Sequence, residues 1–165
     1  MRYYIFSSFF IVFMFSSCTS SFSSDKKIEP AKPQLKLSQV NRWNMMVGKW
    51  YGKHEMKNGG YREHIAERTK NGQYKLTFRT YDKEGNYKEQ IEVGEWGISG
   101  PYYFTMYRGQ VKDKNFFPVD SSNPYNYDAY EILKITKSEF KYKHVEYGDI
   151  FTIKKVPLTF TFESK

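Results

Sequence analysis

Residues 73–98 read QYKLTFRTYDKEGNYKEQIEVGEWGI, and their pattern decides the fold class. In the first half, apolar side chains occupy every second position, at Tyr74, Leu76 and Phe78, with polar side chains between them. A period of two indicates a strand with one buried and one wet face. The turn signal Glu84-Gly85-Asn86 then separates this strand from a second one. The stretch therefore predicts two antiparallel strands joined by a tight turn.

The rest of the chain from residue 48 follows the same pattern, with segments rich in Tyr, Phe, Ile, Val and Thr between turn signals. The predicted strands lie at 48–56, 61–69, 73–82, 87–98, 102–112, 128–136, 139–147 and 150–162. Only residues 37–46 are expected to form a short helix. Eight antiparallel strands tend to close, because closure removes exposed edges. We therefore expect an all-β fold, an antiparallel up-and-down eight-stranded barrel that encloses packed side chains or one small ligand.

The N-terminus has the layout of an export signal. Arg2 precedes a mostly apolar run from Tyr3 to Phe15, and two serines then lead to Cys18. The run of roughly 13 residues is too short to cross a bilayer, which needs about 20, but it fits a signal-peptide core. Cys18 is the only cysteine in the sequence, and a lone thiol in an oxidising compartment requires an explanation.

Residues 15–18, FSSC, resemble the lipobox of bacterial lipoproteins, in which a cysteine is diacylated and becomes the new N-terminus. The resemblance implies a signal peptide at 1–17 and lipidation of Cys18. Because Thr19 rather than Asp follows the cysteine, the resemblance to known sorting signals favours the outer membrane over the inner membrane of the cell envelope. The alternative is an ordinary signal peptide with an incidental cysteine.

Two further regions follow the signal. Residues 18–42 are rich in Ser, Lys and Pro and predict a lipidated N-terminus with a flexible tether. Residues 43–165, about 120 residues, are enough for one core and predict a single barrel domain. The net charge of +8 falls to +7 once residues 1–17, which hold only Arg2 as a charged side chain, are removed. A basic surface favours anionic lipid or an anionic envelope polymer as a partner. Nucleic acid is not expected as a partner, because an exported protein rarely meets it. Alternatively, the lysines only solvate the outer faces of the strands.

The first predicted strand opens with Gly48-Lys49-Trp50-Tyr51-Gly52. This motif resembles the Gly-x-Trp signature of lipocalins and related calycin barrels, in which the Trp plugs the closed end. Residues 127–130, YDAY, lie where lipocalins carry a Thr-Asp-Tyr element. The resemblance implies a lipocalin-like small bacterial lipoprotein that binds a small apolar or amphipathic ligand.

Trp50 and Trp96 both lie close to glycines, which allow the backbone to approach a large ring, so both are expected in the core. Lipocalins usually stack a late Arg on the signature Trp. Here the late basic residues are Lys154 and Lys155.

Polar candidates for a ligand site lie on the strand at 61–69. Acids on one strand face are usually solvated, but Glu63 and Glu67 share the more apolar face of that strand, so one hypothesis is that both carboxylates point into the barrel. Buried carboxylates need partners, which Arg108 or His54 would supply. Such a cluster would orient a ligand; alternatively, the acids are solvated.

One long connection, residues 113–127, carries Phe116, Phe117 and Tyr125. Loops of this length are often functional, so these aromatic side chains are candidates for a lid that contacts a ligand or a membrane. Alternatively, they pin the loop onto the barrel.

Catalytic and metal-binding motifs are not recognisable in the sequence. There is no Gly-x-Ser-x-Gly elbow and no phosphate loop, and His54, His64 and His144 lack metal-ligand spacing. We therefore expect no enzyme and no cofactor. The Gly-x-Trp-x-Gly motif is also similar to that of nitrobindin-type haem barrels, in which a late histidine coordinates the haem iron. The latest histidine of this sequence is His144. The rival to ligand binding is a filled barrel that acts as a structural or interaction module.

Replacing Cys18 with Ser tests the anchor. The variant should remain soluble or uncleaved and should disappear from detergent-extracted membranes, because no acyl chains can be attached. Immunoblots of membrane and soluble fractions would measure this. A mature-size variant that still partitions with membranes would show that the lipobox interpretation is wrong.

Overall fold

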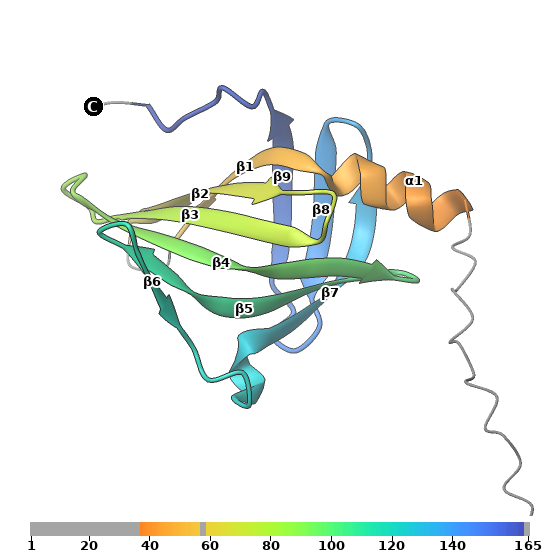
Figure 1. The fold of residues 1–165 in the computed structure, drawn as a ribbon. Coiled ribbons are helices and arrows are strands. Elements are labelled where there is room, and N and C mark those ends of the chain that lie inside the picture. The colour runs from red at the N-terminus through yellow and green to blue at the C-terminus, as the bar shows by residue number, and fades with distance from the viewer. Residues whose placement is uncertain (1–36, 57–58, 164–165) are drawn as a thin grey trace, which may run out of the picture. The chain divides into compact units, whose positions relative to one another are not determined.

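The computed structural model describes residues 37–56 and 59–163 (Figure 1). In chain order the elements are α1 (Leu37–Met46), β1 (Gly48–Glu55), β2 (Tyr61–Arg68), β3 (Gln73–Tyr81), β4 (Tyr87–Ser99), β5 (Tyr102–Lys112), β6 (Asn115–Pro118), the 3-10 helix η1 (Pro124–Asn126), β7 (Tyr127–Ile135), β8 (Glu139–His144) and β9 (Ile150–Val156). The helix and all eight expected strands are present. Cys18 and the predicted signal peptide lie outside the described residues. Within those residues, no helix is long and apolar enough to cross a membrane.

Three segments differ from the expectation. β8 ends at His144 instead of residue 147, because the chain turns at residues 145–147. β9 ends at Val156 instead of residue 162, because Pro157 follows and has no N–H for the ladder. The long connection at 113–127 contains the extra strand β6, which pairs only with the end of β5, from Gly109 opposite Pro118 to Lys112 opposite Asn115.

The strand pairings form a closed circuit. β1 to β5 pair in succession, β5 pairs with β7, and β7, β8 and β9 pair in succession. β9 then returns to β1, where Lys49–Tyr51 faces Lys154–Val156. All these pairs are antiparallel, and in Figure 1 β2 to β5 cross the direction of β8 and β9. The fold is therefore a closed eight-stranded antiparallel barrel, as expected, with β6 outside the circuit.

A bulge bends the two longest strands. The β4–β5 register shifts between Val93 and Gly94. A Cβ atom at Gly94 would collide with the backbone oxygen of Met106 and with the ring of Tyr74, so only glycine fits. Bulges of this kind add twist and curvature, which a small closed barrel requires.

Helix α1 covers one end of the barrel. The Trp43 ring stacks on Trp96 with centroids 4.1 Å apart, and Trp43 Nε1 donates to the carbonyl of Lys70 in the β2–β3 turn at 3.3 Å. Gln39 Nε2 donates to the carbonyl of Ile98, near the end of β4, at 3.0 Å. These contacts join the helix to two strand connections at the same end, which is therefore the closed end.

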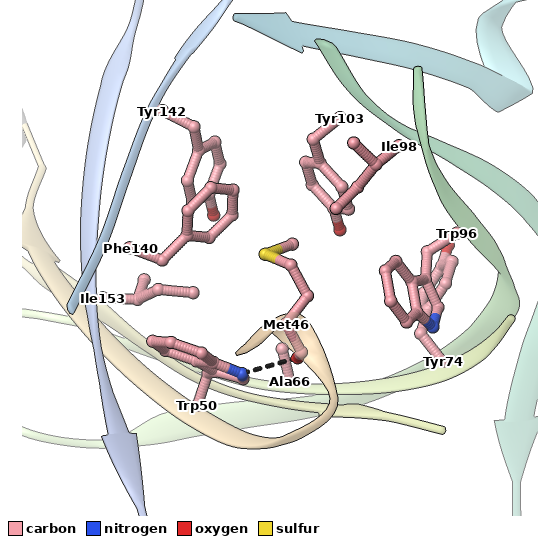
Figure 2. Close-up of a cluster of buried hydrophobic side chains, with 10 residues drawn as sticks. All are labelled: Met46, Trp50, Ala66, Tyr74, Trp96, Ile98, Tyr103, Phe140, Tyr142 and Ile153. Atoms are coloured by element: carbon pink, nitrogen blue, oxygen red, sulfur yellow. Dashed lines mark hydrogen bonds between the residues drawn. The ribbon is translucent and has the colours of Figure 1, made fainter. Parts of the chain in front are cut away.

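Trp50 lies at this closed end and is 0 % exposed. Its Nε1 donates to the carbonyl of Met46 at 2.8 Å, as Figure 2 shows. The ammonium of Lys155 lies 5.2 Å from the centre of a Trp50 ring and donates to the carbonyl of Met45 at 3.0 Å. Lys155 thus has the role that the resemblance assigns to a late arginine. The surrounding core comprises Met46, Trp50, Ala66, Tyr74, Trp96, Ile98, Tyr103, Phe140, Tyr142 and Ile153.

Replacing Trp50 with Ala should lower the free energy of unfolding by about 3–5 kcal/mol, because it empties the core and removes the bond to Met46. Chemical denaturation would measure the loss. Trp43→Ala is the control: its ring is only partly buried, so the loss should be clearly smaller. A loss below about 1 kcal/mol for Trp50→Ala would contradict the plug role.

Candidate functional site

The barrel contains a cavity of about 500 Å³. Its wall is built from inward-facing side chains of every strand of the circuit. The lining residues are His54, Arg62, His64, Ala66, Arg68, Tyr74, Leu76, Phe78, Glu92, Tyr103, Thr105, Tyr107, Asp128, Tyr130, Tyr142, Asp149, Ile150 and Phe151.

The cavity opens at the end opposite α1. Asp149 and Ile150, in and beside the β8–β9 turn, line it while remaining exposed. His54 and Arg62, which flank the β1–β2 turn, line it at the same end. We call this end the mouth and the end near α1 the floor.

The floor is polar and surrounded by aromatic rings. Arg68, at the end of β2, is 5 % exposed, and its Nη2 and Nε donate to the Tyr103 hydroxyl at 2.9 and 3.3 Å. The guanidinium carbon lies 5.0 Å from the Tyr103 ring centre and 5.9 Å from that of Phe140. Tyr142 stacks on Phe140 at 4.5 Å. The rings hold the guanidinium in place and exclude water from it.

His64 lies two residues before Ala66 on the same inward face. Its ring occupies the space above Gly52, where a Cβ atom would collide with His64 and Ile153, so glycine on β1 makes room for histidine on β2. Burial lowers the pKa of His64 to about 3, and the positive charge of Arg68 contributes. His64 is therefore neutral at physiological pH. Its Nδ1 is buried without a hydrogen-bond partner among the described residues.

Charged groups of both signs surround the mouth. Arg62 Nε donates to the Thr80 hydroxyl at 3.0 Å. Burial raises the pKa of Glu92, while the pKa of His54 is lowered, first by burial and then by Arg62. Asp128 contacts His144 Nε2 at 3.2 Å. The mouth therefore combines one arginine with several carboxylates, in contrast to the floor.

The hypothesis that Glu63 and Glu67 point inward is wrong, and the alternative of an outer-face position holds. The Tyr51 hydroxyl donates to Glu63 at 2.9 Å, and Glu67 pairs with Lys75 at 2.8 Å and with Lys49 at 3.7 Å. None of these side chains lines the cavity. Both carboxylates belong to the outer face of the barrel.

The physical reason is the strand register. Ala66 lies opposite Trp50 on β1 and opposite Leu76 on β3, and directly opposed residues share a face. The even-numbered residues of β2 therefore point inward. The apolar residue Ile65 points outward but is only 6 % exposed. Residues 157–163 pack along this outer surface, where the Phe160 ring lies 5.2 Å from Tyr51.

Arg108 and the aromatic residues of the long connection also lie away from the cavity lining. Arg108 Nη2 contacts Glu95 at 2.8 Å on the outside of the barrel. Phe116 and Phe117 lie on β6 and are about half exposed, and Tyr125 is 81 % exposed. Of the predicted ligand contacts, His54 alone lines the cavity within the described residues.

Sequence reasoning did not single out Arg68 and Tyr103 and treated His64 only as a possible metal ligand. The short β2–β3 turn could have revealed that Arg68 and His64 point inward. It places Arg68 opposite Tyr74 and His64 opposite Phe78, and both partners belong to the clear apolar face of β3. Tyr103 carries no such signal, since its neighbours Tyr102 and Phe104 are also aromatic.

The three histidines do not come together in one group of ligands in the described part of the chain. Within the described residues, no group of three or more His, Cys, Asp or Glu side chains could hold a metal ion. His144 Nδ1 accepts from the backbone N–H groups of Glu146 and Tyr147, and Nε2 contacts Asp128. Both ring nitrogens are engaged, so His144 does not fit the role of a haem ligand.

The depressed pKa of His64 predicts loss of stability in acid. The unfolded chain binds this proton near pH 6.5 and the folded chain only near pH 3, so the free energy of unfolding falls as the pH drops through that window. Between pH 7 and 4.5, wild type should lose about 2–3 kcal/mol more than His64→Gln. Urea unfolding at a series of pH values would measure this, and parallel curves for the two proteins would contradict it.

Comparisons with known proteins complete the description of the site. No protein-family model and no curated protein matches the chain. A solved lipocalin-like protein from Bacteroides uniformis is similar, with a TM-score of 0.41 and 13 % identity over 68 % of this chain and 99 % of that one. An uncharacterized protein from Bacteroides eggerthii has a TM-score of 0.40 and 14 % identity over 67 % of this chain and 98 % of that one. The closed eight-stranded antiparallel barrel of this chain is established by its own strand pairings.

Proposed function

We propose that this protein is a lipid-anchored envelope protein whose barrel binds one small amphipathic molecule. The cavity carries the proposal, because about 500 Å³ lies within the range of roughly 300–1,000 Å³ typical of small-molecule sites. Its wall combines apolar and aromatic surface with a few polar groups, which is the usual composition of such sites.

The cavity favours ligand binding over a filled structural barrel. Small side chains at inward positions keep the interior open: Ala66 on β2 and Thr105 on β5. The large aromatic residues Tyr130, Tyr142 and Phe151 form wall contacts with one another, at ring distances between 5.2 and 6.4 Å. The rings therefore line the space and leave it open.

The distribution of groups along the cavity supports an amphipathic ligand. Leu76, Phe78, Ile150 and Phe151 supply apolar wall, while two other lining residues, His64 and Arg68, carry buried polar atoms without hydrogen-bond partners among the described residues. An apolar molecule would leave those polar groups unpaired, and a wholly polar molecule would place its own polar groups against the apolar wall without partners.

The anchor and the location belong to the same proposal. Acylation of Cys18 would hold the barrel near the outer membrane, and the tether before α1 would let it reach lipid or an anionic envelope polymer. In this proposal the barrel binds its ligand and catalyses no reaction.

Replacing Thr105 with Trp tests the cavity. The indole should occupy the interior and weaken binding of the neutral fluorescent probe N-phenyl-1-naphthylamine at least about tenfold, from a micromolar dissociation constant in wild type. Fluorescence titration would measure this, and native mass spectrometry of protein from its own host would identify a retained ligand.

Thr77→Trp is the matched control. Thr77 lies between the cavity-lining residues Leu76 and Phe78 and so faces outward, and its variant should bind as wild type does. The double variant Phe116→Ser, Phe117→Ser should also bind normally, since neither ring lines the cavity. If wild type gives no saturable signal with any neutral or charged amphiphile, the filled barrel is the better account.

A further inference from the structure

The floor of the cavity holds a buried positive charge that lacks an acidic partner. No carboxylate oxygen of the described residues lies within the 4.0 Å salt-bridge distance of Arg68, although five other lysines and arginines and His144 do form such pairs. Among the residues that the structure describes, the only side-chain acceptor of Arg68 is the Tyr103 hydroxyl. Its Nη1 is buried without a hydrogen-bond partner among the described residues.

This arrangement is energetically unfavourable for the barrel alone. A buried ion is tolerated when it is paired, and the two aromatic rings beside the guanidinium offset only part of the cost of desolvation. Arginine is charged at all physiological pH values, so this cost is not avoided by losing a proton. A group that costs stability without an internal partner is typical of a binding site.

Two more hydrogen-bond groups near Arg68 are also unused. The Tyr103 oxygen accepts from Arg68, which leaves its own O–H hydrogen, and no acceptor for it is found among the described residues. His64 Nδ1 is likewise without a partner, and its ring is neutral. His64, Arg68 and Tyr103 all line the same cavity, and Ala66, between His64 and Arg68 on the inward face of β2, adds only a methyl group.

We propose that the floor is a binding site for a single carboxylate, the acid group of an amphipathic monocarboxylic acid, which enters with its acid group first. The assignment rests on the proposed function and specifies the ligand class. Arg68 Nη1–H and the Tyr103 O–H are the donors, and His64, as its Nδ1–H tautomer, is a third.

Charge matching favours a carboxylate over a phosphate monoester. Arg68 supplies one positive charge, and the neutral Tyr103 and His64 supply none, so a monoanion is neutralised and a dianion is left with excess negative charge. Glu92, Asp128 and Asp149 near the mouth would repel a second acid group there. The apolar tail then lies along the wall between floor and mouth.

Competition titrations of the full chain test this assignment. Dodecanoate, dodecanol and dodecyl phosphate, which differ only in the head group, would displace N-phenyl-1-naphthylamine at pH 7.5. We expect dodecanoate to bind at least about tenfold more tightly than dodecanol, and more tightly than dodecyl phosphate.

Two methionine substitutions on one face of β2 form the matched pair. Arg68→Met should abolish the preference of the protein for dodecanoate over dodecanol, while Arg62→Met, at the mouth, should preserve it. The melting temperature of Arg68→Met without ligand should equal or exceed that of wild type, because an unpaired buried charge is removed. A guanidinium needed only for packing would instead lower that temperature and leave the preference unchanged.

Tyr103→Phe keeps the ring and removes one donor, so it should weaken dodecanoate about three- to tenfold and leave dodecanol unaffected. The Tyr103→Phe titrations and the selectivity of wild type for dodecanoate test the carboxylate site even if Arg68→Met does not fold.

The outcomes separate the two proposals. Saturable binding of acid and alcohol with equal affinity would overturn the carboxylate site and leave the proposed function standing. Tighter binding of dodecyl phosphate than of dodecanoate would also overturn the carboxylate assignment. Loss of the preference for dodecanoate in Arg62→Met would show that the carboxylate does not bind at the floor. Failure of all three compounds and of the probe to bind would remove the proposed function itself.

Discussion

The pairing of β9 with β1 is the contact on which the other features of this molecule depend. It joins Lys49–Tyr51 to Lys154–Val156 and turns a strip of strands into a closed surface with an inside and an outside. Once the surface is closed, the period of two along each strand assigns every second side chain to the interior. One register then fixes the plug at Trp50, the glycine at position 52 and the cavity wall together. A shift by one residue would exchange all of these for their neighbours.

The sequence was informative where one face of a strand is clearly apolar. Tyr74, Leu76 and Phe78 define the inward face of β3, and the strand positions follow from the turn signals around it. β2 was ambiguous because both of its faces mix charged and apolar residues. Ile65 is apolar yet lies outside, where it is buried on the outer surface, and Arg68 is charged yet lies inside. Burial of individual residues depends on long-range contacts that local pattern does not contain, so the inward direction of Glu63 and Glu67 could not be settled from their own strand.

The long connection illustrates a different limit. Its length and aromatic residues indicated a functional loop, but Asn115–Pro118 instead extends the β5 ladder as β6. Ladder hydrogen bonds there are satisfied by the backbone of β5, and the ring of Phe116 lies against Gly109, which has no side chain. A local pairing of adjacent segments thus competes with any contact across the mouth, and it requires less loop closure.

Polar groups behind the core and polar groups that line the cavity contribute differently to stability and to binding. Against α1, the Trp50 indole and the Lys155 ammonium are paired, because both donate to carbonyls at the end of the helix. On the cavity wall, Arg68 and His64 retain unpaired atoms although both are less than a tenth exposed. A chain selected only for stability would place apolar side chains at these two positions, as it does at the neighbouring Phe140 and Ile153. The basic surface and the buried arginine are therefore separate features. The outer lysines can act on anionic surfaces through solvent. Arg68 is shielded from such surfaces by the aromatic wall, so it can act only on a group inside the barrel.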